Sequence, residues 1–556
     1  MKGKSGRKLR SAYRSFKEWF AETPLQIFPF RSYLKGYSRE TAKFDLKASV
    51  NVALLAIPQG MAYAAIAELP ILYGIICSAV ASIVAPLFAS SRQTILGPTN
   101  ATSLMVFSFF AAQGLAMEEK LALMPLLVLM VGIICLIGAL LKAADLLQYI
   151  SQSVLVGYIT GAAILIMINQ GKHLFGVADT VQSASNFFGM LDGLLTVSSS
   201  FLWQPALLGG ATLLIYFVIS RFLPTLPNFA LTLFLVALGS AIAANFLPGW
   251  SETVPNFKAY ALNDLQPKFP TASENGIFHD ISTLMSVALA IAFLASLENT
   301  VMSKSIASRT GQRAEINQDM LSVGMANIAC AFTAAMPASG SLTRSALNYE
   351  SKARTGLASL LCGFFCLIAV FAFAFMAPNP VSFVPKTALA ALVVAVAASL
   401  IKWKNIRICL LSTPDDAVVL VITFVTALIA PLYVAIFFGV ALSIFLFLRK
   451  VSKPHLVEYE ISDEGELREL DNKRARPIPA ISIVHVEGAL FFGASELFRT
   501  QVQRIVVDPN LKVIILRLKN AHHLDATSVM AMRDLIRFVD PKIAISSFQG
   551  LRETSI

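Results

Sequence analysis

The sequence has few charged residues. Only 14% of its 556 residues are Asp, Glu, Lys or Arg, and 56% are hydrophobic, whereas about a quarter of the residues in soluble proteins are charged. We therefore interpret the chain as an integral membrane protein. Its formal net charge of +11 lies largely in the N-terminal tail and between apolar stretches, and is not gathered on one soluble domain. Nucleic acid is thus not expected as a partner.

Cysteine and catalytic motifs are also scarce. The six cysteines all lie inside apolar segments, and none has a CxxC spacing with a further Cys or His nearby. We expect no disulfide, metal site or cofactor. No nucleophile–base pair or phosphate-binding loop stands out, so the sequence does not predict an enzyme. The basic N-terminus is followed by no apolar core with a cleavage site, so we interpret residues 1–43 as a cytoplasmic segment.

Long apolar runs dominate residues 44–450, where we expect a transmembrane domain. A membrane-spanning helix needs roughly 20 apolar residues, because its backbone must satisfy its own hydrogen bonds. The first seven expected spans are 45–67, 70–89, 99–114, 121–142, 152–171, 203–220 and 228–247. The second seven are 281–301, 317–335, 342–352, 355–377, 385–402, 414–430 and 431–448.

The positions of the cations support an even number of spans. With the N-terminus inside, the turns after even-numbered spans should hold Lys and Arg. Those turns contain Arg92, Lys142, Arg221, Lys304, Arg309, Arg313, Lys352, Arg354, Lys402, Lys404, Arg407, Arg449, Lys450 and Lys453. We expect a multi-pass protein in the lipid bilayer of the cell (inner) membrane, with both ends in the cytoplasm.

The third and tenth spans are too short to cross a bilayer alone. Each follows a segment broken by small residues and proline, at 93–99 and at 336–343. Interrupted spans at corresponding positions of two halves indicate an inverted-repeat transporter with its site near the bilayer midplane. We therefore predict two repeats of seven spans, at about 45–247 and 281–448.

These broken spans predict an anion site. A helix N-terminus has unpaired N–H groups and a partial positive charge, so half-helices starting near Thr99 and Thr343 would form such a site. Arg344 would add a full charge and five donors. The alternative is that Arg344 marks a cytoplasmic helix end and Pro98 is only a kink.

A few other polar residues stand out in the apolar spans. Glu298 would be an ion ligand, a proton carrier or a partner of Arg344, unless it is solvated at the cytoplasmic interface. Gln59 and Tyr63 share a helix face and could bind an anion or a neighbouring helix. Asn327 and Asp45 are better interpreted as structural.

Beyond residue 454 the pattern changes to a small α/β domain at 455–556. Residues 481–486 and 513–518 are typical of β-strands, and residues 495–507 and 527–539 of amphipathic helices.

Taken in order, these motifs resemble the sulfate permease (SulP) family of anion transporters, which includes the animal solute carrier 26 proteins. The matching stretches are Pro58-Gln-Gly-Met-Ala-Tyr63, Leu69-Pro-Ile-Leu-Tyr-Gly74, Ser90-Ser-Arg-Gln93, Gly97-Pro98, Leu297-Glu298, Gly324-Met-Ala-Asn327 and Ser339-Gly-Ser-Leu-Thr-Arg-Ser-Ala346. The C-terminal domain is similar to a STAS domain, with Leu524-Asp-Ala-Thr-Ser528 at a strand-to-helix turn.

The resemblance implies a fourteen-span fold with a core domain of spans 1–4 and 8–11, which moves like an elevator against a gate domain. It implies a homodimer that transports sulfate, bicarbonate, chloride, oxalate or dicarboxylates by secondary active transport. The site positions that it implies here are Gln59, Tyr63, Gly97, Pro98, Thr99, Glu298, Ser341, Leu342, Thr343 and Arg344.

The sequence departs from the family pattern in two places. Sodium-coupled members have a hydroxyl one helical turn after the span-eight carboxylate, where this chain has Met302, and a thioether is a poor ligand for Na⁺. We therefore expect Glu298 to couple transport to H⁺ rather than Na⁺. The chain also ends soon after residues 548–552, which is consistent with a truncated STAS domain. That domain would bind a regulatory partner, and Thr527 or Ser528 would be a weak candidate for phosphorylation.

Three alternatives remain open from the sequence. The chain could be an uncoupled anion channel or exchanger, a nucleobase permease of the same fold, or a membrane scaffold for partners of the STAS domain. A nucleobase permease would lack the STAS domain, and Arg344 suits an anion better than a neutral base.

Overall fold

The computed structural model describes residues 25–26, 28–31, 37–178, 180–181, 184–223, 227–271, 276–311, 313–376, 379–451, 455–461, 467–469, 478, 480–489, 492–506, 510–522, 525–538 and 544–546. The chain forms two compact units, Met1–Val440 and Ala441–Ile556. Leu524, which belongs to the STAS-like motif, and residues 548–552, on which the expected truncation rests, lie outside the described residues.

The first half of the membrane unit follows the predicted order of apolar runs. Its main helices are α3 (Arg39–Ile66), α4 (Ile71–Phe88), α5 (Asn100–Gln113), α6 (Met117–Leu140), α7 (Gln152–Leu174), α9 (Trp203–Phe222) and α10 (Asn228–Phe246). A two-residue strand, β1 (Leu96–Gly97), precedes α5. A helix that the hydropathy pattern did not predict, α8 (Phe187–Thr196), lies between α7 and α9.

The second half repeats this order. Its main helices are α12 (Ile277–Thr310), α13 (Ile316–Ala331), α14 (Leu342–Glu350), α15 (Leu357–Phe375), α16 (Lys386–Leu400), α18 (Pro414–Ile429) and α19 (Leu432–Val451). The strand β2 (Ser339–Gly340) precedes α14 as β1 precedes α5. The amphipathic helix α17 (Trp403–Ser412) was also not predicted.

Ten stretches of helix in the described chain are long and apolar enough to cross a membrane. Each of the fourteen predicted spans coincides with a helix, but α5, α13, α14 and α18 have only 14, 16, 9 and 16 residues. The helical membrane fold is thus confirmed, whereas the count of fourteen crossings stays a prediction. The shortness of α5 and α14 fits the prediction of two half-helices.

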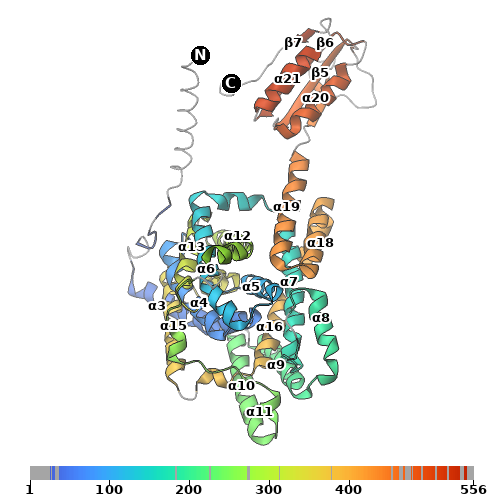
Figure 1. The fold of residues 1–556 in the computed structure, drawn as a ribbon. Coiled ribbons are helices and arrows are strands. Elements are labelled where there is room, and N and C mark those ends of the chain that lie inside the picture. The colour runs from blue at the N-terminus through green and yellow to red at the C-terminus, as the bar shows by residue number, and fades with distance from the viewer. Residues whose placement is uncertain are drawn as a thin grey trace. The chain divides into compact units, whose positions relative to one another are not determined.

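The contacts between helices are symmetric between the two halves. Helix α4 packs on α15 as α6 packs on α13, and α7 packs on α18 as α9 packs on α16. By their order in the two halves, α4 corresponds to α13, α6 to α15, α7 to α16 and α9 to α18. Each of these packing pairs therefore has an equivalent pair in which the two halves have changed places. Figure 1 shows the helices α3–α6, α12, α13 and α15 as one group and α7, α9, α16 and α18 as another. This is the arrangement expected of an inverted repeat with a core and a gate domain.

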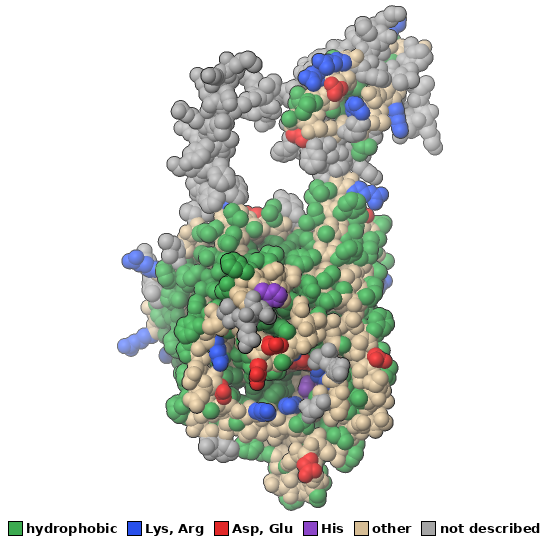
Figure 2. Space-filling view, in the orientation of Figure 1, with side chains coloured by type: hydrophobic (Ala, Val, Ile, Leu, Met, Phe, Trp, Pro, Cys, Tyr) green, Lys and Arg blue, Asp and Glu red, His purple; other side chains and the backbone are tan. Residues whose placement is uncertain are grey.

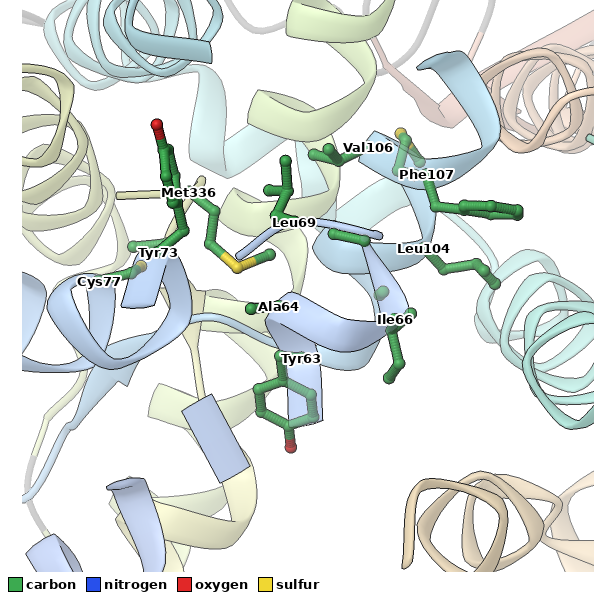
Figure 3. Close-up of a cluster of buried hydrophobic side chains, with 14 of the residues drawn as sticks. Tyr63, Ala64, Ile66, Leu69, Tyr73, Cys77, Leu104, Val106, Phe107 and Met336 are labelled. Carbon is green, nitrogen blue, oxygen red and sulfur yellow. The ribbon is translucent and has the colours of Figure 1, made fainter. Parts of the chain in front are cut away.

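The interior of the membrane unit is apolar. Figure 3 shows part of one continuous cluster, in which Ile66 of α3, Leu104 and Phe107 of α5 and Met336 are buried. On the outside, large hydrophobic side chains remain exposed along the helices, including Phe217, Phe234 and Phe371. Figure 2 shows hydrophobic side chains spread over these helices and few charged ones among them. Such a surface suits contact with lipid.

Two buried polar residues hold segments of the core in place. The carboxylate of Asp45 accepts hydrogen bonds from the backbone N–H groups of Arg354 and Thr355 and from the Thr355 hydroxyl, at 2.7, 3.1 and 2.6 Å. The side chain of Asn327 bonds both the N–H and the carbonyl of Ala338, just before β2. These contacts agree with the structural roles predicted for Asp45 and Asn327.

The C-terminal unit contains a five-stranded sheet in the order β4-β3-β5-β6-β7. The strands are β3 (His455–Ile461), β4 (Leu467–Glu469), β5 (Ile481–Ala489), β6 (Val513–His522) and β7 (Ala544–Ser546). The strands β5, β6 and β7 are parallel, and two helices, α20 (Phe492–Val506) and α21 (Ala526–Phe538), alternate with them. The two predicted strands and two predicted helices are all present.

The start of α21 bears on the phosphorylation hypothesis. Asp525 accepts a hydrogen bond from the N–H of Ser528, and the hydroxyl of Ser528 is buried against Ser495 at 2.8 Å. A kinase could not reach this hydroxyl in the folded domain, so the structure argues against Ser528 as the phosphorylated residue. Thr527 is exposed.

Candidate functional site

A two-stranded crossing brings the two half-helices together. The strands β1 and β2 are antiparallel, with Leu96 opposite Gly340 and Gly97 opposite Ser339. Each strand leads directly into its half-helix, so the N-termini of α5 and α14 lie beside the same small sheet. The sequence predicted this convergence from the small residues and prolines alone, and the pairing of β1 with β2 is its physical cause.

Each half-helix begins with a hydroxyl cap. The Thr99 hydroxyl accepts from the N–H of Thr102, and the Ser341 hydroxyl accepts from the N–H of Arg344. In each case the cap satisfies one of the first N–H groups of the helix and leaves the preceding ones without an intrahelical partner. Two sets of backbone donors and two positive helix ends therefore meet at the crossing.

Glycine is required on both strands of the crossing because other chain segments approach closely. A Cβ on Gly97 would lie 2.5 Å from Nη1 of Arg344. A Cβ on Gly340 would lie 2.7 Å from Oδ1 and 2.9 Å from Cα of Asn299 in α12. Larger residues at either position would push the side chain of Arg344 or the backbone of α12 away from the site.

Arg344 is fully buried and links the two halves. Its Nη2 donates to the carbonyl of Pro98 at 2.6 Å, and its Nη1 donates to the hydroxyl of Ser78 in α4 at 3.2 Å. Its Nε has no partner among the described residues. The alternative that Arg344 only marks an exposed helix end does not fit this burial. The guanidinium lies next to β1, where its charge adds to that of the helix ends.

Glu298 lies on the other side of the crossing and contacts both halves. Its Oε2 accepts from the hydroxyl of Thr99 at 3.0 Å and from the hydroxyl of Ser339 at 2.6 Å. No ion pair joins Glu298 to Arg344 in the part of the chain described here. Glu298 is partly buried on α12 within a run of buried residues, so it is not solvated at a helix end.

The remaining predicted residues divide into two groups. Gln59 and Tyr63 are buried on α3, and Oε1 of Gln59 has no hydrogen-bond partner among the described atoms. Figure 3 shows the Tyr63 ring pointing away from the other labelled side chains of the apolar cluster. In contrast, Leu342 and Thr343 in the first turn of α14 are exposed. Their side chains therefore do not enclose a pocket, and what they can contribute to the site is their backbone N–H groups.

Met302 has a definite place in this arrangement. Its sulfur lies 3.0 Å from the hydroxyl of Ser345 in α14, and that hydroxyl also accepts from the N–H of Ile95. Met302 is 1% exposed, so the thioether fills the position one turn after Glu298. Its low affinity for hard cations leaves that position unsuited to Na⁺.

Sequence reasoning missed two polar residues that touch the predicted site. Ser78 accepts from Arg344, and Ser339 donates to Glu298. Both are small hydroxyl residues in apolar or glycine-rich segments, and no spacing rule singles them out. Ser339 belongs to the 339–346 motif of the family resemblance. What marks it as a site residue is its pairing opposite Gly97, which the sequence does not show.

The described residues also include no group of three or more His, Cys, Asp or Glu side chains that could hold a metal ion. The chemistry available at the crossing is therefore that of backbone N–H donors, hydroxyls, one guanidinium and one carboxylate.

Comparison with known proteins identifies the family of the chain. The sulfate permease family model matches residues 43–423, which is most of the chain, and a STAS domain model matches residues 472–545. The chain belongs to the sulfate permease family. The family resemblance and the STAS domain predicted from the motifs are thereby confirmed.

Among its relatives, sulfate transporter 4.1, chloroplastic, from Arabidopsis thaliana is 27% identical over 544 residues, covering 94% of this chain and 77% of that protein. High affinity sulfate transporter 2 from Stylosanthes hamata is 21% identical, covering 92% and 82%. The solved structure of murine solute carrier 26 family member A9, an anion transporter in the inward-facing state, matches with a TM-score of 0.83 at 19% identity, covering 94% of this chain and 87% of that one. That structure shares the fold of this sulfate permease family member.

Proposed function

We propose that this protein is a secondary active transporter of small anions, that it binds its substrate at the β1–β2 crossing, and that H⁺ drives the transport. The observation that carries the proposal is the convergence of the N-termini of α5 and α14 beside the buried guanidinium of Arg344. Preorganised backbone donors and a fixed cation suit an anion. Relatives named as sulfate transporters support an oxoanion of this type.

The proposed proton coupling follows from the charges at the crossing. Glu298 bridges hydroxyls from both halves and is not neutralised by Arg344. An ionised Glu298 would repel a bound anion in this poorly solvated region, and a protonated Glu298 would leave the charge of Arg344 unopposed. Anion and proton should therefore each favour binding of the other, by the reciprocity of linked equilibria. Met302, next to Ser345, supports H⁺ over Na⁺.

The proposed motion is an elevator-like shift of the core group of helices, α3–α6 and α12–α15, against the gate group. Both half-helices, Arg344 and Glu298 belong to the core group, so the site would move as one body. We further propose that the chain lies in the cell membrane as a homodimer with its STAS domain in the cytoplasm.

Uptake into proteoliposomes tests the proposal. Purified protein is reconstituted, and accumulation of labelled sulfate, bicarbonate and fumarate is measured under an inward proton gradient, an inward sodium gradient and neither. We expect proton-driven accumulation of at least one of these anions. Anion currents that depend on neither the proton gradient nor the sodium gradient would instead support the channel alternative. If none of the three anions is taken up, the same assay with labelled uracil tests the nucleobase permease alternative, which uptake of that base would support.

A further inference from the structure

A second polar region lies away from the β1–β2 crossing. A cavity of about 660 Å³ is formed by the C-terminal end of α3, the N-terminal ends of α4, α6 and α16, the C-terminal end of α7 and the loop 257–268. It therefore lies between core helices and gate helices, at the end of α3 farthest from the chain's N-terminus. If that terminus is cytoplasmic, as the proposed function has it, the cavity opens to the outside of the cell.

The cavity is lined by an excess of cationic side chains. Four lysines and one histidine line it, whereas its carboxylates are those of Glu68 and Asp264. The lysines are Lys172, Lys258, Lys268 and Lys386. Lys172 is paired with Glu68. No carboxylate in the described part of the chain lies within ion-pair distance of the other three. Converging unpaired cations on the walls of a cleft raise the local concentration of anions.

A buried donor in the wall points to a ligand. Gln170 lines the cavity, is only 1% exposed, and its Nε2 has no hydrogen-bond partner among the described atoms. An orphaned donor of this kind is costly, and burial normally requires that it be satisfied. Lys172, two residues further along α7, is 6% exposed. An acceptor oxygen on a bound molecule could satisfy Gln170 while remaining close to these lysines.

We propose that this cavity is a second anion-binding site, which takes small divalent oxoanions of the sulfate type and supplies them to the β1–β2 crossing. The unpaired lysines Lys258, Lys268 and Lys386 favour a divalent anion over a monovalent one, because each cation adds to the attraction of every charge on the ligand. The volume exceeds that of one such anion and leaves room for water between the anion and the lysine side chains. The direction of supply rests on the proposed function, but the binding site itself does not.

Protection of an engineered thiol tests the site. All six native cysteines are buried, and Ala259 is an exposed lining residue between Lys258 and Tyr260. In the purified Ala259→Cys protein, the rate of labelling by a sulfonate-bearing methanethiosulfonate is measured with sulfate or gluconate at constant ionic strength. At twice its Kd, sulfate should slow labelling about threefold, since about a third of the sites would be free.

Two sets of substitutions test whether the protection comes from sulfate bound in this cavity. Replacing Lys258, Lys268 and Lys386 by Gln, or Gln170 by Leu, should raise the sulfate concentration for half-protection about tenfold, as expected for loss of a charge-assisted bond. The matched control replaces Lys402, Lys404 and Arg407 by Gln. These residues are exposed beyond the opposite end of α16, and their loss should leave half-protection unchanged. Absence of protection, or equal effects of both triple substitutions, would overturn the proposal.

A further variant separates this site from the crossing. Gly97→Val places bulk against the guanidinium of Arg344 and should disable the crossing without touching the cavity. Protection of the engineered thiol that persists in this background supports two separate sites, and its loss would show that the thiol merely reports on the crossing. If proteoliposomes take up no anion yet sulfate protects the thiol of the Ala259→Cys protein, the proposed function fails while the second site stands.

Discussion

The guanidinium of Arg344, in the first turn of α14, donates to the carbonyl of Pro98, the residue just before the cap of α5, at 2.6 Å. This bond joins the half-helix of one repeat to the half-helix of the other. It also holds a full positive charge next to two helix N-termini, in a position that the surrounding chain leaves fully buried. Anion binding in our account depends on this one side chain more than on any other.

Arg344→Lys should therefore impair transport although it keeps the charge. A lysine has a single ammonium and cannot reproduce the fork that contacts both Pro98 and Ser78. We expect kcat/KM for anion uptake to fall by about tenfold or more, the cost of a lost charge-assisted hydrogen bond. Uptake kinetics with the size-exclusion profile as a folding check measure this. A monodisperse variant with normal kcat/KM would contradict the assigned role.

Gly97→Ala should weaken transport by a steric route. The new methyl would lie 2.5 Å from Nη1 of Arg344, so the guanidinium must leave its position. Gly210→Ala is the matched control, because a Cβ there meets nothing within 4 Å and alanine favours helix. We expect uptake to fall for the first variant and to stay normal for the second. Equal activities would mean that the crossing tolerates displacement of Arg344.

Ser339→Ala removes one of the two hydroxyls that bond Glu298. The carboxylate would keep only the bond from Thr99, so its ionised form would lose stability and the pH profile of uptake should shift to higher pH, because the proton would be held more firmly. Ser322→Ala is the control, since Ser322 is equally buried and bonds only the backbone of its own helix at Asp319. A pH profile that moves in both variants, or in neither, counts against Glu298 as the coupling group.

Asp45→Ala should destabilise the protein without changing substrate affinity. It would leave the buried N–H of Thr355 unpaired, at a cost of about 1–3 kcal/mol, and would also remove the partner of the partly buried N–H of Arg354. Thermal unfolding in detergent should show a lower midpoint, while KM of the folded protein stays normal. A raised KM with unchanged unfolding would place Asp45 in the transport mechanism.

Much of this arrangement could be predicted from the chain. The lengths of the apolar runs predicted every main helix, because a membrane-spanning segment must form its backbone hydrogen bonds within itself. The prolines and small residues at 93–99 and 336–343 gave the broken spans. The pairing of Gly97 with Ser339 could not be predicted from the sequence, since a strand of two residues is too short to show an alternating hydrophobic pattern. The amphipathic helices α8 and α17 were missed because their apolar stretches are too short to register as spans.

The direction of side chains also lay beyond sequence reasoning. The pattern placed Arg344 and Glu298 at one site and left their mutual pairing open. In the structure each is bonded to other groups instead, Arg344 to Pro98 and Ser78, and Glu298 to Thr99 and Ser339. Which partner a buried charge finds depends on contacts between residues far apart in the chain.

The central claim is that Glu298 carries the proton that drives anion uptake. The most direct measurement compares sulfate accumulation by wild-type and Glu298→Gln proteoliposomes under an inward proton gradient, with sulfate exchange at equal pH as the control for an intact site. We predict that the wild type accumulates sulfate and that the variant exchanges sulfate but does not accumulate it. Undiminished proton-driven accumulation in the variant would contradict the account.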